Sequence, residues 1–414
     1  MADFPSHRAF FSLNEQLGQV WLSSLGVVGC VRGATMAPAA FRISASTQVV
    51  QQQRDLSFVR HAVSIHGGIQ VCLRELLARA DDAKAQHFVV CLDKQQYNSA
   101  RLLSPGMQAL QGPALVIGSD ARSSNLDKLT CTKRTGHSTT AAESDTSSRF
   151  GHGALSLYSA SDVVQHLSGD ELHVSDPHAT HLDRLSAWRC NFADASSQNY
   201  VDLSSKAPGQ LEPFIGVTQS CAAFPAWEGK SSYPWTLFRL SLRTEDAAAA
   251  SQISQQHFNA DECASMLEDF ASAAADLLLC LQHVQKISVY VKEGSQNNAV
   301  LLHQSNAEVV RDPVGQQSLQ QQLVVNSQHA DGSTACQTWA KIGPCAKHGS
   351  GIAVFLKDNK SDERLPVIAG KNLAARCTMP MASTGLPFHV FGAFMLSSDG
   401  RSLNDAEAGK VRPH

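Results

Sequence analysis

The alternation of helical and strand-like segments between residues 57 and 243 is the feature that most constrains the fold. Residues 69–84 carry apolar side chains at helical spacing, and the short stretches 87–92, 114–117 and 171–174 have the apolar character of strands. Such alternation is typical of layered α/β structures, because each helix buries its apolar stripe against a sheet. The sequence therefore predicts an α/β fold.

Within the predicted helix, the charged residues Glu75 and Arg79 are four positions apart. Residues at this spacing lie on the same face of a helix, one turn above the other. The plainest interpretation is an amphipathic helix whose charged side is only a solvated face. The alternative is that the two side chains point at a common site.

The residues LRELLARADDA at 73–83 resemble the first nucleotide-binding helix of GHKL ATPases, the class of gyrases, heat-shock chaperones and histidine kinases. The resemblance implies that Glu75 is the catalytic residue that activates water. In that family an Asn one turn later holds Mg²⁺, whereas this chain has Arg79. A guanidinium has donors and no acceptor, so Arg79 cannot be a metal ligand. It could contact a nucleotide phosphate directly or occlude the pocket.

Later motifs follow the order found in sacsin-like proteins. They are SPGM at 104–107, GPAL at 112–115, IGSD at 117–120, RTGHS at 134–138, FGHGALSLY at 150–158, SGDELHVSDPH at 168–178, TLFRLSLR at 236–243 and TGLPFHVFG at 384–392. Each motif is short, but their shared order is specific, and the chain is identified as a member of the sacsin-like family. The resemblance implies a GHKL, or Bergerat-type, two-layer α/β sandwich over residues 57–243.

The resemblance also implies a nucleotide lid near Gly151 and Gly153. Glycines allow a backbone to approach phosphates closely, and a helix beginning there would favour their negative charge. The chain departs from the family pattern at Ser148, where the family has Gly, and at Ala154, where it has an aromatic residue. Two glycines in a polar stretch are also common in ordinary turns, so both interpretations stay open.

Two further nucleotide-binding residues are implied by position. Asp120 matches the residue that accepts the exocyclic amine of adenine, a role that suits an acceptor-only carboxylate. Its alternative is a turn-forming Asp in the polar stretch 118–124. Thr236 matches the hydroxyl residue of the family's closing strand, although the Gly before it is Trp235 here, whose bulk is expected to narrow the pocket.

Composition narrows the function classes. The net charge of −3 offers no basic field for nucleic acid or for an acidic membrane surface. The 11 cysteines are scattered without C-x-x-C pairs, which favours reduced thiols in the cytoplasm or nucleus. Residues 176–183 (DPHATHLD) have metal-ligating types at short spacing, but the Pro breaks helical periodicity, so no metal site is predicted there.

Outside the ATPase-like region, residues 1–56 match no known pattern and are expected to be a poorly ordered leader. Residues 244–414 resemble the middle domain of heat-shock chaperones, with a helix over 261–283, strands at 286–291, 351–356 and 388–391, and a Gln-rich loop at 304–322. The family continues beyond this point, so the segment is expected to be truncated.

Two functions are compatible with these observations. The first is a Mg-ATP-dependent chaperone-like ATPase, and the second is a non-hydrolysing chaperone or scaffold that binds protein clients or other chaperones. ATP is the cofactor that the resemblance implies, while Arg79 counts against Mg²⁺. Since phosphoryl transfer depends on metal-assisted charge neutralisation, the sequence favours the second function.

Overall fold

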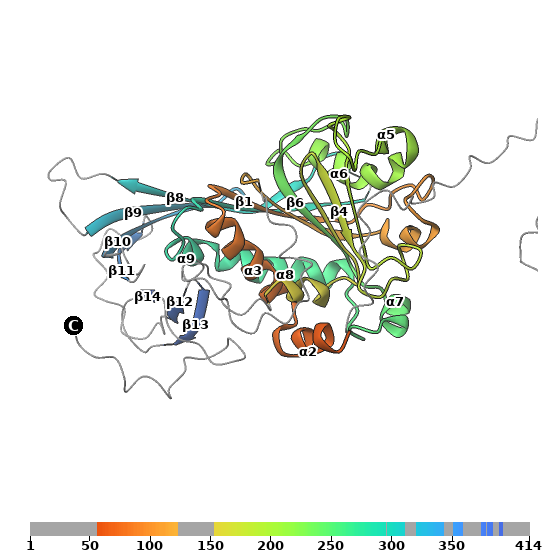
Figure 1. Cartoon of the computed structure of the whole chain (residues 1–414). Helices are drawn as coiled ribbons and strands as arrows, with labels where there is room; N and C mark the ends of the chain where they lie inside the picture. The colour runs from red at the N-terminus through yellow and green to blue at the C-terminus, as the bar shows by residue number, and fades with distance from the viewer. Residues whose placement is uncertain are drawn as a thin grey trace, which may run out of the picture. The chain divides into compact units, whose positions relative to one another are not determined.

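The computed structural model describes residues 56–122, 153–294, 296–310, 320–342, 351–358, 374–377, 379–383 and 389–391. Its strands form one mixed sheet of 14 strands in the order β13-β12-β14-β11-β10-β9-β8-β7-β1-β2-β6-β3-β4-β5, with helices packed against it (Figure 1). The α/β class expected from the sequence is therefore confirmed.

The elements have the following bounds. The helices are α2 Leu56–His66, α3 Ile69–Asp82, η1 Pro105–Leu110, η3 Gly153–Ser159, α5 Leu203–Lys206, α6 Pro208–Ser220, α7 Glu245–Ala250, α8 Ala260–Ser272 and α9 Ala274–Leu278. The strands are β1 His87–Asp93, β2 Ala114–Ser119, β3 Val164–Gly169, β4 Glu171–Ser175, β5 Ala187–Asn191, β6 Tyr233–Ser241, β7 Lys286–Lys292, β8 Val300–Val310, β9 Gln320–His329, β10 Thr334–Ile342, β11 Gly351–Asp358, β12 Ala374–Cys377, β13 Met379–Ser383 and β14 His389–Phe391.

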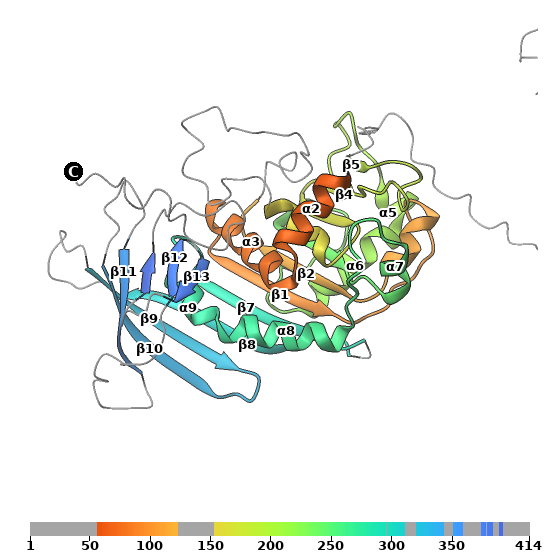
Figure 2. The same cartoon turned by 90° about the horizontal axis from the view of Figure 1, so that it is seen from below.

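Strand β1 lies in the middle of the sheet, antiparallel to β2 and parallel to β7. Its apolar residues are buried on both sides because both faces of the sheet are covered. Helices α2, α3 and α8 cover one face (Figure 2). We call this the α3 face.

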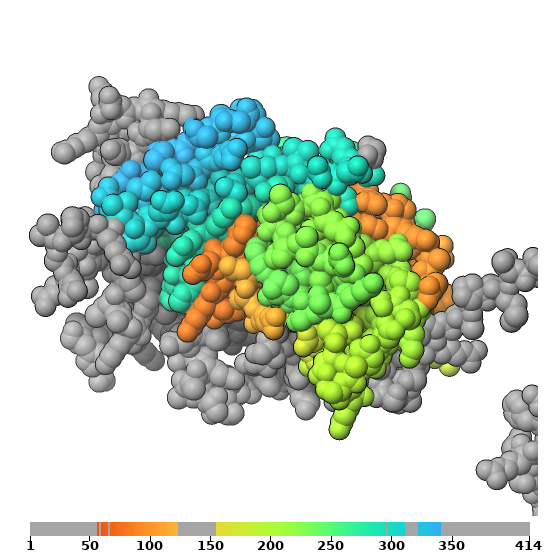
Figure 3. Space-filling model, turned by 90° about the horizontal axis from the view of Figure 1, so that it is seen from above, coloured from red at the N-terminus to blue at the C-terminus, as the bar shows by residue number. Residues whose placement is uncertain are grey.

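On the opposite face, α6 packs Leu211, Phe214 and Val217 against β1, β2 and β6. This region is the green mass seen from above in Figure 3. This part of the chain therefore has a third layer in addition to the two-layer sandwich that the resemblance implies, and the GHKL assignment itself stays a prediction. The apolar residues of α6 are interrupted by Gly, Gln and Pro, so their helical periodicity is weak in the sequence.

Helix α3 forms where the sequence predicts it and ends two residues earlier. Ile69, Leu73, Leu76 and Leu77 belong to the stripe that is buried on the sheet. Near its end, the Asp81 carboxylate accepts hydrogen bonds from the backbone N–H groups of residues 282–284, at 2.7–3.1 Å. This contact joins the helix to a segment 200 residues later in the chain.

The helix predicted over 261–283 is interrupted. Helix α8 begins with a capping box formed by Asn259 and Glu262, and it ends at Ser272, before the short α9. The predicted apolar stripe is nevertheless correct, since Phe270, Ala274 and Leu277 are buried. The chain leaves the helix after Leu278, and Asp81 binds the N–H groups of residues 282–284 that helix continuation would have used.

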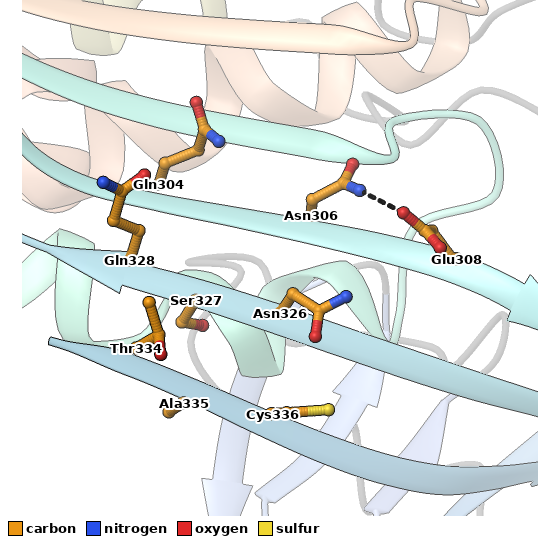
Figure 4. A pocket seen from close by; sticks show the side chains of 9 residues that line it. All are labelled: Gln304, Asn306, Glu308, Asn326, Ser327, Gln328, Thr334, Ala335 and Cys336. Carbon is orange, nitrogen blue, oxygen red and sulfur yellow. Dashed lines mark hydrogen bonds between the residues drawn. The ribbon is translucent and has the colours of Figure 1, made fainter.

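The loop predicted over residues 304–322 is wrong for the part that the structure describes. Residues 304–310 belong to β8, and residues 320–322 begin β9. Buried Ser305 and Ala307 alternate with more exposed polar residues. This two-residue alternation is expected for a strand with one solvent-exposed face. On that face, polar side chains line a shallow hollow of about 400 Å³ across β8, β9 and β10 (Figure 4). The high glutamine content concealed the alternation.

The division predicted after Arg243 stays a prediction. Residues on both sides of it share one core: β7 pairs with β1, and α8 packs with α3. The leader 1–55 lies outside the described residues. Among the helices that the structure describes, none is long and apolar enough to cross a membrane.

Candidate functional site

The predicted site residues lie on four elements. Glu75 and Arg79 are on α3, Asp120 directly follows β2, Thr236 is on β6, and Gly153 begins η3. Helix α3 contacts η3, and β2 pairs with β6, so the structure brings these elements together in two pairs. Gly151 lies outside the described residues.

Glu75 and Arg79 are partly buried on α3. Burial raises the pKa of Glu75, while the charge of Arg79 opposes that shift and Asp82 adds to it. Burial also lowers the pKa of Arg79, against the effect of the two carboxylates. Within the described part of the chain, Arg79 Nε has no hydrogen-bond partner. The two charges therefore differ from an ordinary solvated helix face.

Asp120 is held at the end of β2 by the backbone of the neighbouring strand. Its Oδ1 accepts hydrogen bonds from the N–H groups of Gln86 at 2.8 Å and His87 at 3.1 Å. This contact fixes the start of β1 against the end of β2. One carboxylate oxygen thus has a structural role, and Oδ2 is the oxygen that could accept from an adenine amine.

Thr236 lies opposite Ser119 on β2 and opposite Ser168 on β3. Its hydroxyl donates to the carbonyl of Ala121 at 2.8 Å, so the Ser168 hydroxyl, 2.9 Å away, donates to Thr236. Thr236 therefore positions the segment that follows Asp120. The structure places Asp120 and Thr236 at the same end of the β2–β6 pair, as a shared site requires.

Trp235 does not have the expected effect on this site. Neighbouring residues of a strand point to opposite faces, and Trp235 packs against Phe224 on the α6 side of the sheet, with ring centroids 6.0 Å apart. Thr236 and Phe238 share the other face, where Phe238 belongs to the core under α3. The bulk of Trp235 therefore leaves the α3 face unobstructed.

Two buried arginines, Arg239 on β6 and Arg243 just after that strand, were not identified by sequence reasoning. Arg239 donates to the carbonyls of Leu110 at 2.6 Å and Gly112 at 2.9 Å. Burial lowers its pKa to about 10, opposed by the charges of Asp93 and Tyr97. This arginine fixes the segment that contains GPAL.

Arg243 has the corresponding role on η3. Its guanidinium donates to the carbonyls of Tyr158 at 2.7 Å and Ser159 at 2.8 Å, and to Asp162 at 2.9 Å. The end of η3 is the downstream anchor of the lid that the resemblance implies. The available sequence signal was the spacing of two arginines, four residues apart, in and just after a largely apolar stretch, since buried arginines need partners.

His166 on β3 is a further residue that the sequence did not single out. It is buried, lies directly opposite His173 on β4, and packs on Phe238 with ring centroids 4.5 Å apart. Burial lowers its pKa well below the usual range, and nearby His173 and Arg189 act in the same direction. Neither ring nitrogen has a hydrogen-bond partner among the described residues. A neutral imidazole with unused polar atoms thus lies on the α3 face.

The segment 176–183 forms a turn. The Asp176 carboxylate accepts the N–H groups of His181 at 2.7 Å and Leu182 at 3.0 Å. In the ranges that the structure describes, no three His, Cys, Asp or Glu side chains are grouped to hold a metal ion.

Comparison with known proteins identifies the family. The Sacsin domain family matches residues 57–304, which include α3, β6 and every described element of the candidate site. Human sacsin is 30% identical over 237 residues, covering 56% of this chain and 5% of human sacsin. The chain therefore spans a small part of that relative's length. From the family match over more than half of its residues, we conclude that the chain belongs to the Sacsin domain family.

Proposed function

We propose that this chain is a chaperone or scaffold module with a degenerate GHKL-type nucleotide-binding domain, which binds protein partners without hydrolysing ATP. Membership of the Sacsin domain family supports the chaperone-related role. The observation that carries the proposal is the partly buried pair Glu75 and Arg79 on α3. A cation stands where the family places a metal-holding amide.

The presence of Arg79 in place of the family's metal-holding amide matters because it changes the charge at this position. Phosphoryl transfer depends on positioning and on neutralising phosphate charge, mainly through Mg²⁺. Arg79 supplies a positive charge but no acceptor oxygen, so it neutralises phosphate without recruiting the ion. Binding of a nucleotide is compatible with these groups, whereas efficient hydrolysis is not.

The remaining contacts are assigned by the same reasoning. Asp120 Oδ2 accepts from the adenine amine, Thr236 holds the segment around it, and Arg79 donates to the phosphates. Gly151 and Gly153 form the lid that covers them, with its downstream end fixed by Arg243. ATP or ADP is the ligand, and Mg²⁺ is not required.

Titration calorimetry with ATP and ADP, with and without Mg²⁺, tests this assignment. The wild-type protein should bind nucleotide with an affinity that Mg²⁺ changes little. Arg79→Asn restores an acceptor oxygen and should make binding Mg²⁺-dependent, because the metal then has a ligand. The control is Arg60→Asn, which removes an exposed arginine from α2 and should behave as wild type.

Strong Mg²⁺ dependence of the wild-type affinity would favour the alternative, an active Mg-ATP-dependent ATPase. No nucleotide binding by either protein would show that the pocket is closed. The chaperone role is tested separately: the wild-type protein should suppress aggregation of a heat-unfolded client equally well with and without ATP. Suppression that requires ATP would contradict the proposal.

A further inference from the structure

A histidine pair on β8 and β9, three strands along the sheet from β2, has the geometry of a metal-binding pair. His303 on β8 and His329 at the end of β9 are direct cross-strand partners. Their Nδ1 atoms are 3.3 Å apart, and their rings meet edge to face with centroids 4.9 Å apart. Zinc–imidazole bonds are about 2.0–2.1 Å long, so two nitrogens at neighbouring corners of a tetrahedron lie about 3.4 Å apart.

The surroundings of His303 orient its ring. Its Nε2 is 2.7 Å from the Ser305 hydroxyl, which is 2.8 Å from the hydroxyl of Ser327. A hydrogen bond at one ring nitrogen selects the tautomer and leaves the other nitrogen free to bind. Metal-binding histidines ordinarily have such a second partner. If Nε2 donates to Ser305, the Nδ1 lone pair of His303 points toward His329.

Access to the pair is also suitable for a metal ion. His303 is only 4% exposed, whereas His329 is exposed, so an ion could reach the pair from the His329 side.

We propose that His303 and His329 bind one divalent transition-metal ion of the zinc or copper class through their Nδ1 atoms. On binding, the Nδ1 proton of His329 moves through water to its Nε2, so both imidazoles stay neutral and no net proton is released, and water completes the coordination. Imidazole ligands suit zinc and copper, and oxygen-seeking Mg²⁺ or Ca²⁺ would not be retained. This site is independent of the proposed nucleotide function.

Titration with CuSO₄ and ZnCl₂, followed by calorimetry and by electron paramagnetic resonance of Cu²⁺, tests the proposal. The wild-type protein should show a Cu²⁺ signal with two nitrogen donors, which distinguishes the pair from cysteine ligands. His303→Ala or His329→Ala should weaken that site at least about tenfold. His257→Ala, an exposed histidine elsewhere, should leave it unchanged.

His329→Ala is the decisive variant because His329 is exposed, so its loss should leave the circular dichroism spectrum unchanged. Ser305→Ala should weaken binding without removing a ligand, since it frees the His303 ring. Unaltered Cu²⁺ and Zn²⁺ affinity in a folded His329→Ala variant would overturn the proposal. The contact between the rings would then be only a hydrogen bond.

Discussion

At the scale of single residues, the buried His166 side chain on the α3 face is expected to lower the free energy of unfolding. A buried polar group without a partner costs about 1–3 kcal/mol. His166→Leu should therefore raise the free energy of unfolding at pH 7 by about 1 kcal/mol, because leucine has a similar volume and no polar atom. Urea denaturation measures the change. A clear loss of stability would mean that the imidazole has a polar partner in the protein.

The same variant makes a prediction about pH. The folded-state pKa of His166 is lowered, so the unfolded chain takes up the proton first and the stability of the folded protein falls as the pH falls below 6.5. His166→Leu should lose less stability than wild type between pH 6.5 and 5, by about 1 kcal/mol per pH unit. The control His257→Leu should follow the wild-type curve, and a His166→Leu curve that also follows it would contradict the assignment.

The arrangement of a residue could be predicted from the sequence where it depends on local spacing, and could not where it depends on contacts with segments distant in the chain. The positions of Glu75 and Arg79 on one helix follow from local spacing alone, and the structure has that helix. The hydrogen-bond partners of Asp81 and Arg239, and the Phe238 ring on which His166 packs, come from segments far away in the chain, so no local pattern could reveal them. The nucleotide roles of Glu75, Arg79, Asp120, Gly151, Gly153 and Thr236 remain proposals.

At the scale of elements, β6 and the residues directly after it organise the candidate site through two buried arginines, Arg239 on the strand and Arg243 beyond its end. Arg243→Met would leave the carbonyls of Tyr158 and Ser159 without their donor and Asp162 without its counter-charge. Breaking a buried ion pair by removing one partner typically costs about 3–5 kcal/mol, so a loss of this size is expected in urea denaturation. The exposed control Arg60→Met should cost under about 0.5 kcal/mol. Equal stability of the two variants would contradict this role for Arg243.

The type of an element could be predicted where its apolar residues followed one clear pattern, either an apolar run typical of a strand or a helical stripe. The strands β1, β2 and β7 are short apolar runs, and α3 has a clear helical stripe. The predicted helix over 261–283 was too long because its end is set by Asp81, a tertiary contact that overrides local propensity. Strand β8 was not predicted because glutamine and asparagine on its solvent-exposed face concealed the alternation of buried and exposed residues.

At the scale of the whole molecule, the proposed division into residues 57–243 and 244–414 can be tested by limited proteolysis. The first described residues after Arg243 include exposed positions in α7, so early cleavage between residues 244 and 256 is expected. The fragments should remain associated in gel filtration because β7 pairs with β1 and α8 packs on the α3 face. Early cuts inside the elements of either part, with none between 244 and 256, would count against this boundary.

Steady-state ATP turnover tests the central claim most directly. Wild-type protein and Glu75→Ala should be compared at saturating ATP with Mg²⁺ and with a chelator. We predict that the two proteins do not differ in turnover and that Mg²⁺ has no effect, because Arg79 replaces the metal-holding group and Glu75 alone cannot neutralise phosphate charge. Steady Mg²⁺-dependent turnover that disappears in Glu75→Ala would contradict the account and identify the chain as an active ATPase.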